Sequence, residues 1–241
     1  MLPSFLEKLI NPKYLKHRPL EKAIIAIDGF AATGKSTLAK RLSNHLGLPY
    51  VDSGALFRGI TFLAIEKGWI TDTNIYEKSI EEGISQLKFN FDSLSNTLTL
   101  NKRDITNQIR SKLVSSYVSQ IAKLPFVRYY LLKQQRQMGS SNGLVMDGRD
   151  IGTAVFPEAD FKFFFTAKPE VRAQRRWEEM KADGYLLGYN EVLKNILDRD
   201  KIDTERKVSP LIKADDAIEI DSTYLSLQQV FEICVAKING K

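Results

Sequence analysis

Apolar residues along the chain follow two spacings, which predict alternating strands and helices. Residues 23–28 form an apolar run that ends in Asp28, and such a run is typical of a strand buried on both faces of a parallel sheet. Residues 38–46 place apolar side chains three or four positions apart, which predicts one buried helix face. The alternation continues with strands expected at 49–52, 144–147, 161–166 and 217–220 and helices at 55–67, 107–122, 126–138, 169–182, 189–200 and 226–238. This order predicts an α/β fold.

A third pattern interrupts this rhythm between residues 71 and 106. Residues 88–92 and 97–101 alternate apolar and polar side chains with period two, and the residues 93–96 between them suit a turn. An antiparallel hairpin with one solvated face is therefore expected there, as a small insertion into the α/β chain.

Residues 1–22 precede the first expected strand and form an N-terminal appendage. Pro3, Pro12 and Pro19 interrupt it, and one short amphipathic stretch lies between them. That stretch suits a short helix docked on the body, which we favour, or a contact with a partner.

Composition limits the class of protein. The 241 residues suit one domain with a modest insertion, and 43% apolar and 27% charged residues are ordinary for a soluble globular chain. The single cysteine, Cys234, lies in an apolar pattern and cannot form an internal disulfide. The sequence has neither the run of about 20 apolar residues that crosses a bilayer nor a signal-peptide core. We therefore expect a cytoplasmic protein without membrane contact.

The strongest motif lies directly after the first expected strand. The eight residues Gly29, Phe30, Ala31, Ala32, Thr33, Gly34, Lys35 and Ser36 match G-x-x-x-x-G-K-[ST], and a helical pattern follows. Glycines let the backbone turn sharply, so successive N–H groups can surround phosphate oxygens at a helix N-terminus. Lys35 would supply a cation to the β- and γ-phosphates, and Ser36 a hydroxyl to Mg²⁺. Residues 29–37, including Thr37, are thus the expected ATP site; Ala32 stands where many related loops carry glycine.

Asp147 ends an expected strand, and a carboxylate there can hold the water shell of Mg²⁺. Its alternative role is that of a turn residue before Gly148. The phosphate loop in the same chain favours the magnesium role. The loop predicts nucleotide binding but not kinase chemistry.

Arginines beside short polar or glycine segments suggest that the net charge of +6 serves phosphate binding. The planar guanidinium bonds two phosphate oxygens at once, whereas a nucleic-acid surface would show a basic stripe with exposed aromatics. No such stripe is present, and we expect no nucleic-acid partner. The arginines concerned are Arg58, Arg110, Arg128, Arg149, Arg199 and Arg206; Arg172, Arg175 and Arg176 suit a lid or a solvated helix face equally.

Several segments together resemble one known family. Asp52–Arg58 (DSGALFR) resembles D-[ST]-G-x-x-[YF]-R, and Asp147–Pro157 (DGRDIGTAVFP) resembles D-G-R-D-I-G-T-x-V-F-P, both of bacterial cytidylate kinases. Weaker matches are Ser119-Gln120, Pro125–Arg128, Arg199–Arg206 and Ser209–Leu211. The resemblance covers about residues 23–238 in consistent order. It departs from the family at Ile202, a position that is usually basic or polar and whose role Lys201 could take.

The resemblance implies a three-layer P-loop kinase fold with a parallel five-stranded sheet. The kinase domain would span 23–238, with an inserted NMP-binding subdomain at 71–106 and a helical lid at 183–208. It also implies transfer of the γ-phosphoryl group of ATP to CMP and dCMP with Mg²⁺, and we expect a monomer.

The resemblance also assigns roles to individual residues. The cytosine or its phosphate surroundings would be recognised by Ser53, Arg149 and Asp150. The CMP phosphate would be held, or the base flanked, by Arg58 and Arg128. The sugar would be reached by Ser119, Arg199 and Asp203, and Arg206 would bridge phosphates. The catalytic set would be Lys35, Asp147, Arg199 and Arg206.

Physical chemistry supports a cytosine site at Asp150. A carboxylate can accept from the exocyclic amine of cytosine but would face a carbonyl of uracil, and such a buried mispairing costs about 1–3 kcal/mol. Two simpler interpretations stay open: a surface ion pair between Arg149 and Asp150, and a solvated helix face carrying Arg199, Asp200 and Asp203.

Rival functions also remain. The nearest is a P-loop kinase for AMP, UMP or another small metabolite. A more distant one is a non-catalytic module that binds nucleotide or nucleic acid.

Overall fold

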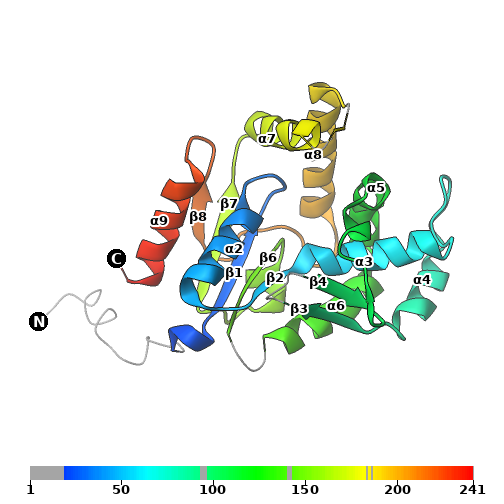
Figure 1. Cartoon of the computed structure of the whole chain (residues 1–241), viewed down its shortest axis with the longest axis horizontal. Helices are drawn as coiled ribbons and strands as arrows, with labels where there is room; N and C mark the ends of the chain where they lie inside the picture. The colour runs from blue at the N-terminus through cyan, green and yellow to red at the C-terminus, as the bar shows by residue number, and fades with distance from the viewer. Residues whose placement is uncertain (1–18, 93–96, 140–142, 183, 186, 241) are drawn as a thin grey trace, which may run out of the picture.

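The computed structural model describes residues 19–92, 97–139, 143–182, 184–185 and 187–240. Within these ranges a parallel sheet has the strand order β2-β6-β1-β7-β8. Its strands are β1 (Ile24–Gly29), β2 (Tyr50–Asp52), β6 (Leu144–Gly148), β7 (Phe161–Thr166) and β8 (Ile218–Asp221). The five-stranded parallel sheet is confirmed, and its strands point toward one edge, above which α7 and α8 lie (Figure 1).

Helices cover both faces of this sheet. The described helical segments are η2 (Leu20–Lys22), α2 (Lys35–Leu46), α3 (Ser53–Glu66), α4 (Glu77–Ile84), η3 (Gln108–Arg110), α5 (Lys112–Ile121), α6 (Pro125–Met138), η4 (Ile151–Val155), α7 (Pro169–Ala182), α8 (Tyr189–Glu205) and α9 (Leu227–Ile238). Alternate residues of β1 face opposite sides, as the period of a strand requires. Ile25 and Ile27 pack with α2 and α9, whereas Ile24 and Ala26 pack with η4 and α6. The three-layer α/β architecture is thereby confirmed.

The expected hairpin is present, and one more strand joins it. The strands β3 (Phe89–Asp92), β4 (Thr97–Leu100) and β5 (Arg103–Asp104) form an antiparallel sheet. Leu98 and Leu100 are buried while Thr97 and Thr99 are partly exposed, so one face of β4 is solvated as expected. Residues 93–96 lie outside the described residues. The helix α4 and the strand β5 were not predicted, because each is short and its pattern is irregular.

Element ends differ modestly from those expected. The helix α8 continues to Glu205, five residues beyond the expected end at 200. The short turn η4, a π-helix directly after Asp150, was not predicted because its apolar residues resemble a strand. Cys234 of α9 is buried in the apolar core of the protein, as expected.

Most of the appendage, residues 1–18, lies outside the described residues. Of the rest, Leu20–Lys22 forms the short helix η2 ahead of β1. The division into appendage, kinase domain, insertion and lid stays a prediction. No helix among the described residues is long and apolar enough to span a membrane.

Candidate active site

The loop between β1 and α2 forms a backbone turn at the carboxyl edge of the sheet. Gly29 has a φ of 146°, and a Cβ there would lie 2.2 Å from the carbonyl oxygen of Phe165. Gly34 has a φ of 88° and directly precedes Lys35, the first residue of α2. The backbone N–H groups at this helix start have no intrahelical partner. The loop therefore offers donors to an anion, as the motif predicted.

Ala32 adopts a left-handed backbone conformation with a φ of 58°. This conformation costs a non-glycine residue about 1–2 kcal/mol, which explains why glycine suits the position. The methyl group also packs against the apolar cluster of α7 and α8 that contains Ala173, Val192 and Ile196. Alanine thus adds a contact between the loop and these two helices, where glycine would have none.

Lys35 is buried beside the loop. Its Nζ donates to the carbonyl oxygen of Phe30 at 3.1 Å, and only 6% of the residue is exposed. Burial, followed by the nearby Arg149 charge, lowers the pKa of Lys35 to about 7, although Asp147 opposes this shift. A group of phosphates would restore the charged form, so the site as it stands favours an anionic ligand.

Asp147 lies at the end of β6 between two hydroxyl groups. Ser36 Oγ donates to Asp147 Oδ2 at 2.6 Å, and the Tyr50 hydroxyl donates to Asp147 Oδ1 at 2.7 Å. Burial, and then the charge of Asp52, raises the pKa of Asp147. Asp52 is the register partner of Asp147 on the neighbouring strand β2.

These oxygens fit a magnesium ion that arrives with a triphosphate. Mg²⁺ prefers oxygen ligands, keeps several waters and commonly takes few ligands from the protein. The hydroxyl of Ser36 and the carboxylate of Asp147 are such ligands, and they lie in contact. The described residues hold no cluster of three or more His, Cys, Asp or Glu side chains that could bind a metal ion.

Asp52 and Arg58 form an ion pair at the start of α3. Arg58 Nη2 lies 2.6 Å from Asp52 Oδ2, while Asp52 Oδ1 caps the helix by accepting from the N–H of Ala55. Burial alone would raise the pKa of Asp52, but the Arg58 guanidinium, with the N–H of Ala55 and the charge of Lys35, holds the pKa below its usual value. Ser53 Oγ donates to the carbonyl oxygen of Asp147 and thereby joins this helix start to β6.

Four guanidinium groups share two buried carboxylates beside these residues. Arg128 Nη2 lies 2.6 Å from Asp150 Oδ2, and Arg206 Nη2 lies 3.6 Å from Asp150 Oδ1. Arg149 Nε donates to Asp203 Oδ2 at 2.8 Å. Asp203 also pairs with Arg206 at 3.3 Å and with Arg199 at 4.0 Å.

This arrangement overturns both simpler interpretations from the sequence. Arg149 and Asp150 do not form a surface pair, because each is partnered by a residue of another element. Asp203 is buried, so Arg199 and Asp203 are not a solvated helix face.

The cluster has an excess of positive charge. Burial lowers the pKa of Arg199 to about 10, and the charge of Arg149 adds to this lowering. Burial likewise lowers the pKa of Arg206 to about 10, and there the charge of Arg128 contributes. Burial alone would raise the pKa of Asp203, but Arg149, Arg199 and Arg206 hold it below its usual value. Within the part of the chain that the structure describes, four buried guanidinium nitrogens lack a hydrogen-bond partner: Arg58 Nε, Arg128 Nε, Arg199 Nε and Arg206 Nη2. An anionic ligand would supply both the missing charge and the missing acceptors.

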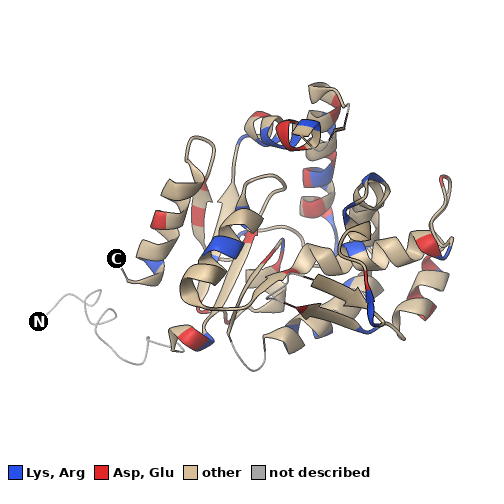
Figure 2. Ribbon diagram, in the orientation of Figure 1, with Lys and Arg blue, Asp and Glu red and all other residues tan. Residues whose placement is uncertain are grey.

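The helices α7 and α8 carry much of the charge above the sheet edge, as Figure 2 shows. Arg172 of α7 forms a two-pronged ion pair with Asp200 of α8, at 3.0 and 2.6 Å. It also donates weakly to the carbonyl oxygen of Ala31, at 3.4 Å, and its guanidinium lies over the ring of Phe30. Arg172 therefore ties both helices to the phosphate loop.

The two neighbouring arginines of α7 differ from each other. Arg175 donates to the carbonyl oxygen of Ser222 at 2.7 Å, whereas Arg176 pairs with Glu179 on the exposed face. The solvated-face interpretation is thus wrong for Arg172 and Arg175 and correct for Arg176.

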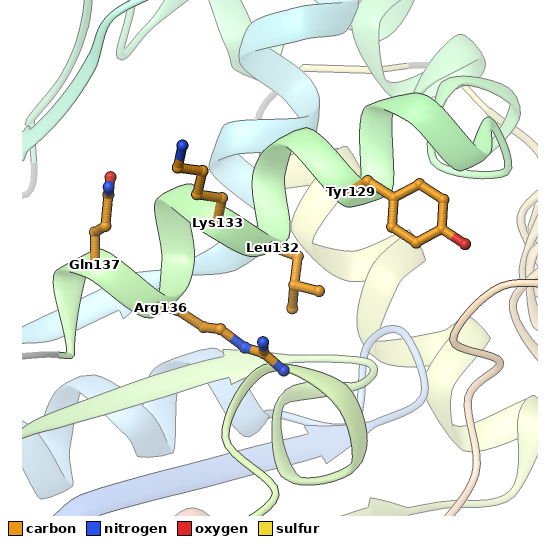
Figure 3. Close-up of a pocket in the computed structure, with 5 residues that line it drawn as sticks. All are labelled: Tyr129, Leu132, Lys133, Arg136 and Gln137. Atoms are coloured by element: carbon orange, nitrogen blue, oxygen red, sulfur yellow. The ribbon is translucent and has the colours of Figure 1, made fainter.

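Two cavities lie along α6. The smaller is lined partly by Phe57, Arg128 and Asp150 and so opens on the arginine cluster. The larger, of about 360 Å³, is an open hollow between Tyr129, Leu132, Lys133, Arg136 and Gln137 (Figure 3). It shares Tyr129 and Leu132 with the smaller cavity but lacks Arg128 and Asp150. Of the two, the smaller cavity is therefore the one in contact with the arginine cluster.

The comparison with known families decides the assignment. The family model described as cytidylate kinase matches residues 25–240. The chain belongs to the cytidylate kinase family. A cytidylate kinase of Flavobacterium psychrophilum is 47% identical over 225 residues, covering 92% of this chain and 100% of the relative. A cytidylate kinase of Bacteroides thetaiotaomicron is 46% identical over 214 residues, covering 87% and 93%.

Among solved structures the similarity is more distant. A gluconokinase from Sinorhizobium meliloti aligns with a TM-score of 0.47 at 13% identity, over 91% of this chain and 93% of that one. The resemblance that the motifs indicated is confirmed by the family model and the close relatives.

The structure brings most of the predicted site residues together, with two exceptions. Ser119 is half-buried on α5, a helix that contacts α8, and Arg110 lies exposed at the end of η3. Three residues at the site had no role assigned from the sequence. Tyr50 donates to Asp147, Asp200 pairs with Arg172, and Asp28 accepts from the N–H groups of Ile151 and Gly152, directly after Asp150. The sequence contained a sign that Asp28 has a role at the site, because a carboxylate at the end of an apolar strand next to a phosphate loop is costly to bury.

Proposed function

We propose that this protein transfers the γ-phosphoryl group of ATP to CMP, and to dCMP, giving ADP and CDP or dCDP. The observation that carries the proposal is the buried arginine cluster, in which Arg128 and Arg206 pair with Asp150 and Arg149 pairs with Asp203. It lies beside a phosphate loop at the same sheet edge. The family of the chain and the names of its relatives support the same activity.

ATP would lie with its phosphates on the loop of residues 29–37. The loop N–H groups and Lys35 would bind the phosphate oxygens, and the ligand would return Lys35 to its charged form. A magnesium ion held by Ser36 and Asp147, largely through water, would neutralise charge on the triphosphate.

CMP would bind with its base at Asp150, beside Phe57; the cavity there measures about 20 Å³, so this region would open to admit the nucleotide. The carboxylate of Asp150 would accept from the exocyclic amine of cytosine. Arg149 precedes Asp150 in the chain and Ser53 donates to the backbone of Asp147, so both are proposed to complete the base site. Arg58 and Arg128 would take the CMP phosphate, and Ser119, Arg199 and Asp203 are proposed for the sugar. The unpartnered guanidinium nitrogens of this set support an anionic occupant.

In the reaction an oxygen of the CMP phosphate attacks the γ-phosphorus of ATP. The bond between that phosphorus and the β–γ bridging oxygen breaks, and ADP leaves with the electron pair. The attacking oxygen is already ionised at neutral pH, so no general base is required. Lys35, Arg199 and Arg206 act by holding and stabilising charge on the transferred group.

The helices α7 and α8 would exclude water from the transferred group. Transfer to water instead of CMP would waste ATP, so the site benefits from closure over both substrates. The contacts of Arg172 with Asp200 and with the loop are one physical means of joining these helices to the donor site.

A coupled assay of ADP release tests this proposal across CMP, dCMP, UMP and AMP. We expect turnover with CMP and dCMP and a kcat/KM for UMP at least tenfold lower. Preference for AMP or UMP would favour the rival small-acceptor kinase. ADP release with none of the four, together with salt-sensitive binding to polynucleotide, would favour a binding module.

A further inference from the structure

Asp28 is the last charged residue before the phosphate loop. It lies at the end of β1, its register partner on β6 is Gly148, and only 4% of it is exposed. Asp28 Oδ1 accepts from the N–H of Ile151 at 2.8 Å, and Oδ2 accepts from the N–H of Gly152 at 2.7 Å. One side chain thus joins the donor strand to the segment that follows Asp150.

These two bonds replace a cap that Asp150 does not make. Ile151 and Gly152 begin the turn η4, where the first N–H groups have no partner within the turn. Asp150 occupies the position before the turn, where an aspartate would often cap with its own side chain. Its carboxylate makes no such bond and instead pairs with Arg128. Asp28 supplies the cap from across the sheet and leaves Asp150 free to face the cavity.

The carboxylate is costly to keep at this position. Burial raises the pKa of Asp28 to about 7, and the nearby charge of Asp150 adds to this rise. The hydrogen bonds from Gly152 and Ile151 and the charge of Arg149 oppose it. An asparagine would avoid the burial of charge, but it offers one acceptor oxygen and would direct its NH₂ group at the second N–H. Only a carboxylate accepts from both amides with two separate oxygens.

Close packing makes the segment sensitive to this anchor. A Cβ on Gly152 would lie 3.1 Å from Lys162 Cδ and 3.4 Å from Asp28 Oδ2. The backbone therefore has little room to shift while Asp28 holds it. Without the two bonds, the chain that carries Arg149 and Asp150 loses the hydrogen bonds that it donates to a β1 side chain and keeps the apolar packing of η4 on Ile24 and Ala26.

We propose that Asp28 is a positioning residue for the acceptor: it fixes the backbone of Ile151 and Gly152 so that Arg149 and Asp150 face the CMP site. The inference rests on the proposed function. It adds a residue that touches neither nucleotide and links the start of the donor loop to the acceptor segment.

The test is the kinetics of Asp28→Asn. We expect the KM for CMP to rise about tenfold or more and the ratio of kcat/KM for CMP over UMP to fall, while the KM for ATP stays within about twofold. The matched control is Asp160→Asn, because Asp160 Oδ2 accepts from the N–H of Ile24 at the opposite end of β1. The control should change neither the KM for CMP nor the ratio.

Two results would overturn the proposal. One is an unchanged KM for CMP in a folded Asp28→Asn protein. The other is an equal rise of the KM values for CMP and ATP, which would indicate general damage to the sheet edge. If Asp28→Asn does not fold, Asp28→Glu displaces the carboxylate and carries the same expectations.

A separate measurement does not depend on turnover. In the wild-type protein, the amide proton signals of Ile151 and Gly152 should shift together by NMR as the pH passes through about 7. In Asp28→Asn this joint shift should be absent. Arg149, Asp150 and Lys162 face the same segment and are retained in both proteins, so a joint shift that persists in the variant would overturn the anchor. Absence of CMP turnover in a wild-type protein that shows the shift would instead refute the proposed function.

Discussion

Arg128 of α6 donates to the carboxylate of Asp150 at 2.6 Å, and both side chains are almost fully buried at the mouth of the smaller cavity. The same arginine also donates to the carbonyl oxygen of Ala122, which fixes its direction. Asp150 Oδ1 has a weaker neighbour, Arg206 at 3.6 Å. This oxygen is therefore the acceptor that remains for a substrate amine.

The pair leads to a prediction about base selectivity. In Asp150→Asn the carboxylate that would accept from cytosine becomes an amide that can also donate to the uracil carbonyl. We expect the ratio of kcat/KM for CMP over UMP to fall by about 5- to 150-fold, which corresponds to loss of a pairing worth about 1–3 kcal/mol. Initial rates of ADP release measure it, with Asp198→Asn on the exposed face of α8 as the control. An unchanged ratio would remove Asp150 from base recognition.

Lys35 predicts an uptake of protons when ATP binds. Because its pKa is about 7 in the unliganded protein, Lys35 is largely neutral at pH 8, and bound phosphates would restore its charge. Binding therefore takes up a proton, and the affinity for ATP should fall as the pH rises from 7 to 9, by up to about tenfold per unit. Calorimetry in buffers of different ionisation enthalpy measures the uptake. The variant Lys35→Met should show none; an equal uptake in that variant would assign the proton to another group.

Ala32 gives a prediction about the strain in the loop. Ala32→Gly relieves the left-handed conformation but loses the methyl contact with α7 and α8 and adds chain entropy to the unfolded state. These effects oppose one another, so we expect the free energy of unfolding to change by less than about 1 kcal/mol. Ala32→Val should destabilise by more, because a branched side chain at positive φ is strained. Urea denaturation compares the two, and an equal effect of both would argue against strain at this position.

The ion pair of Arg172 and Asp200 should contribute to stability as a unit. Asp200→Ala leaves Arg172 buried without its partner and should cost about 3–5 kcal/mol. The double change Arg172→Met with Asp200→Leu should recover part of this loss, because it removes both buried charges. On the same helix Lys194 and Asp198 form an exposed pair, so Asp198→Ala should cost less than about 1 kcal/mol. Additive losses in the double variant would contradict the coupling.

Local patterns predicted the parallel sheet because each buried strand is a short apolar run between turn signals. The phosphate loop was equally predictable, since its glycines and Lys35 are constrained by phosphate geometry within eight consecutive residues. The hairpin strands β3 and β4 were predictable from their period of two, whereas β5 is two residues long and carries no pattern.

The partners of the charged residues were not predictable from spacing. Asp203 lies four residues after Arg199 on one helix, which suggested an exposed pair, yet Arg149 from another element is its shortest contact. Arg58 was expected to hold the CMP phosphate or flank the base, and its ion pair with Asp52 was not predicted. Such pairs depend on which strand ends meet at the sheet edge, and that is set by the strand order and not by neighbouring residues in the chain.

The proposed phosphoryl transfer is tested by following the fate of the γ-phosphoryl group. ATP labelled at the γ-phosphate is incubated with CMP and the wild-type protein, with Lys35→Ala as the inactive, folded control. Transfer to CMP places the label in CDP, at a rate that falls by orders of magnitude in the Lys35→Ala variant. Label found only in inorganic phosphate, or equal transfer by the wild type and the variant, would contradict the proposal.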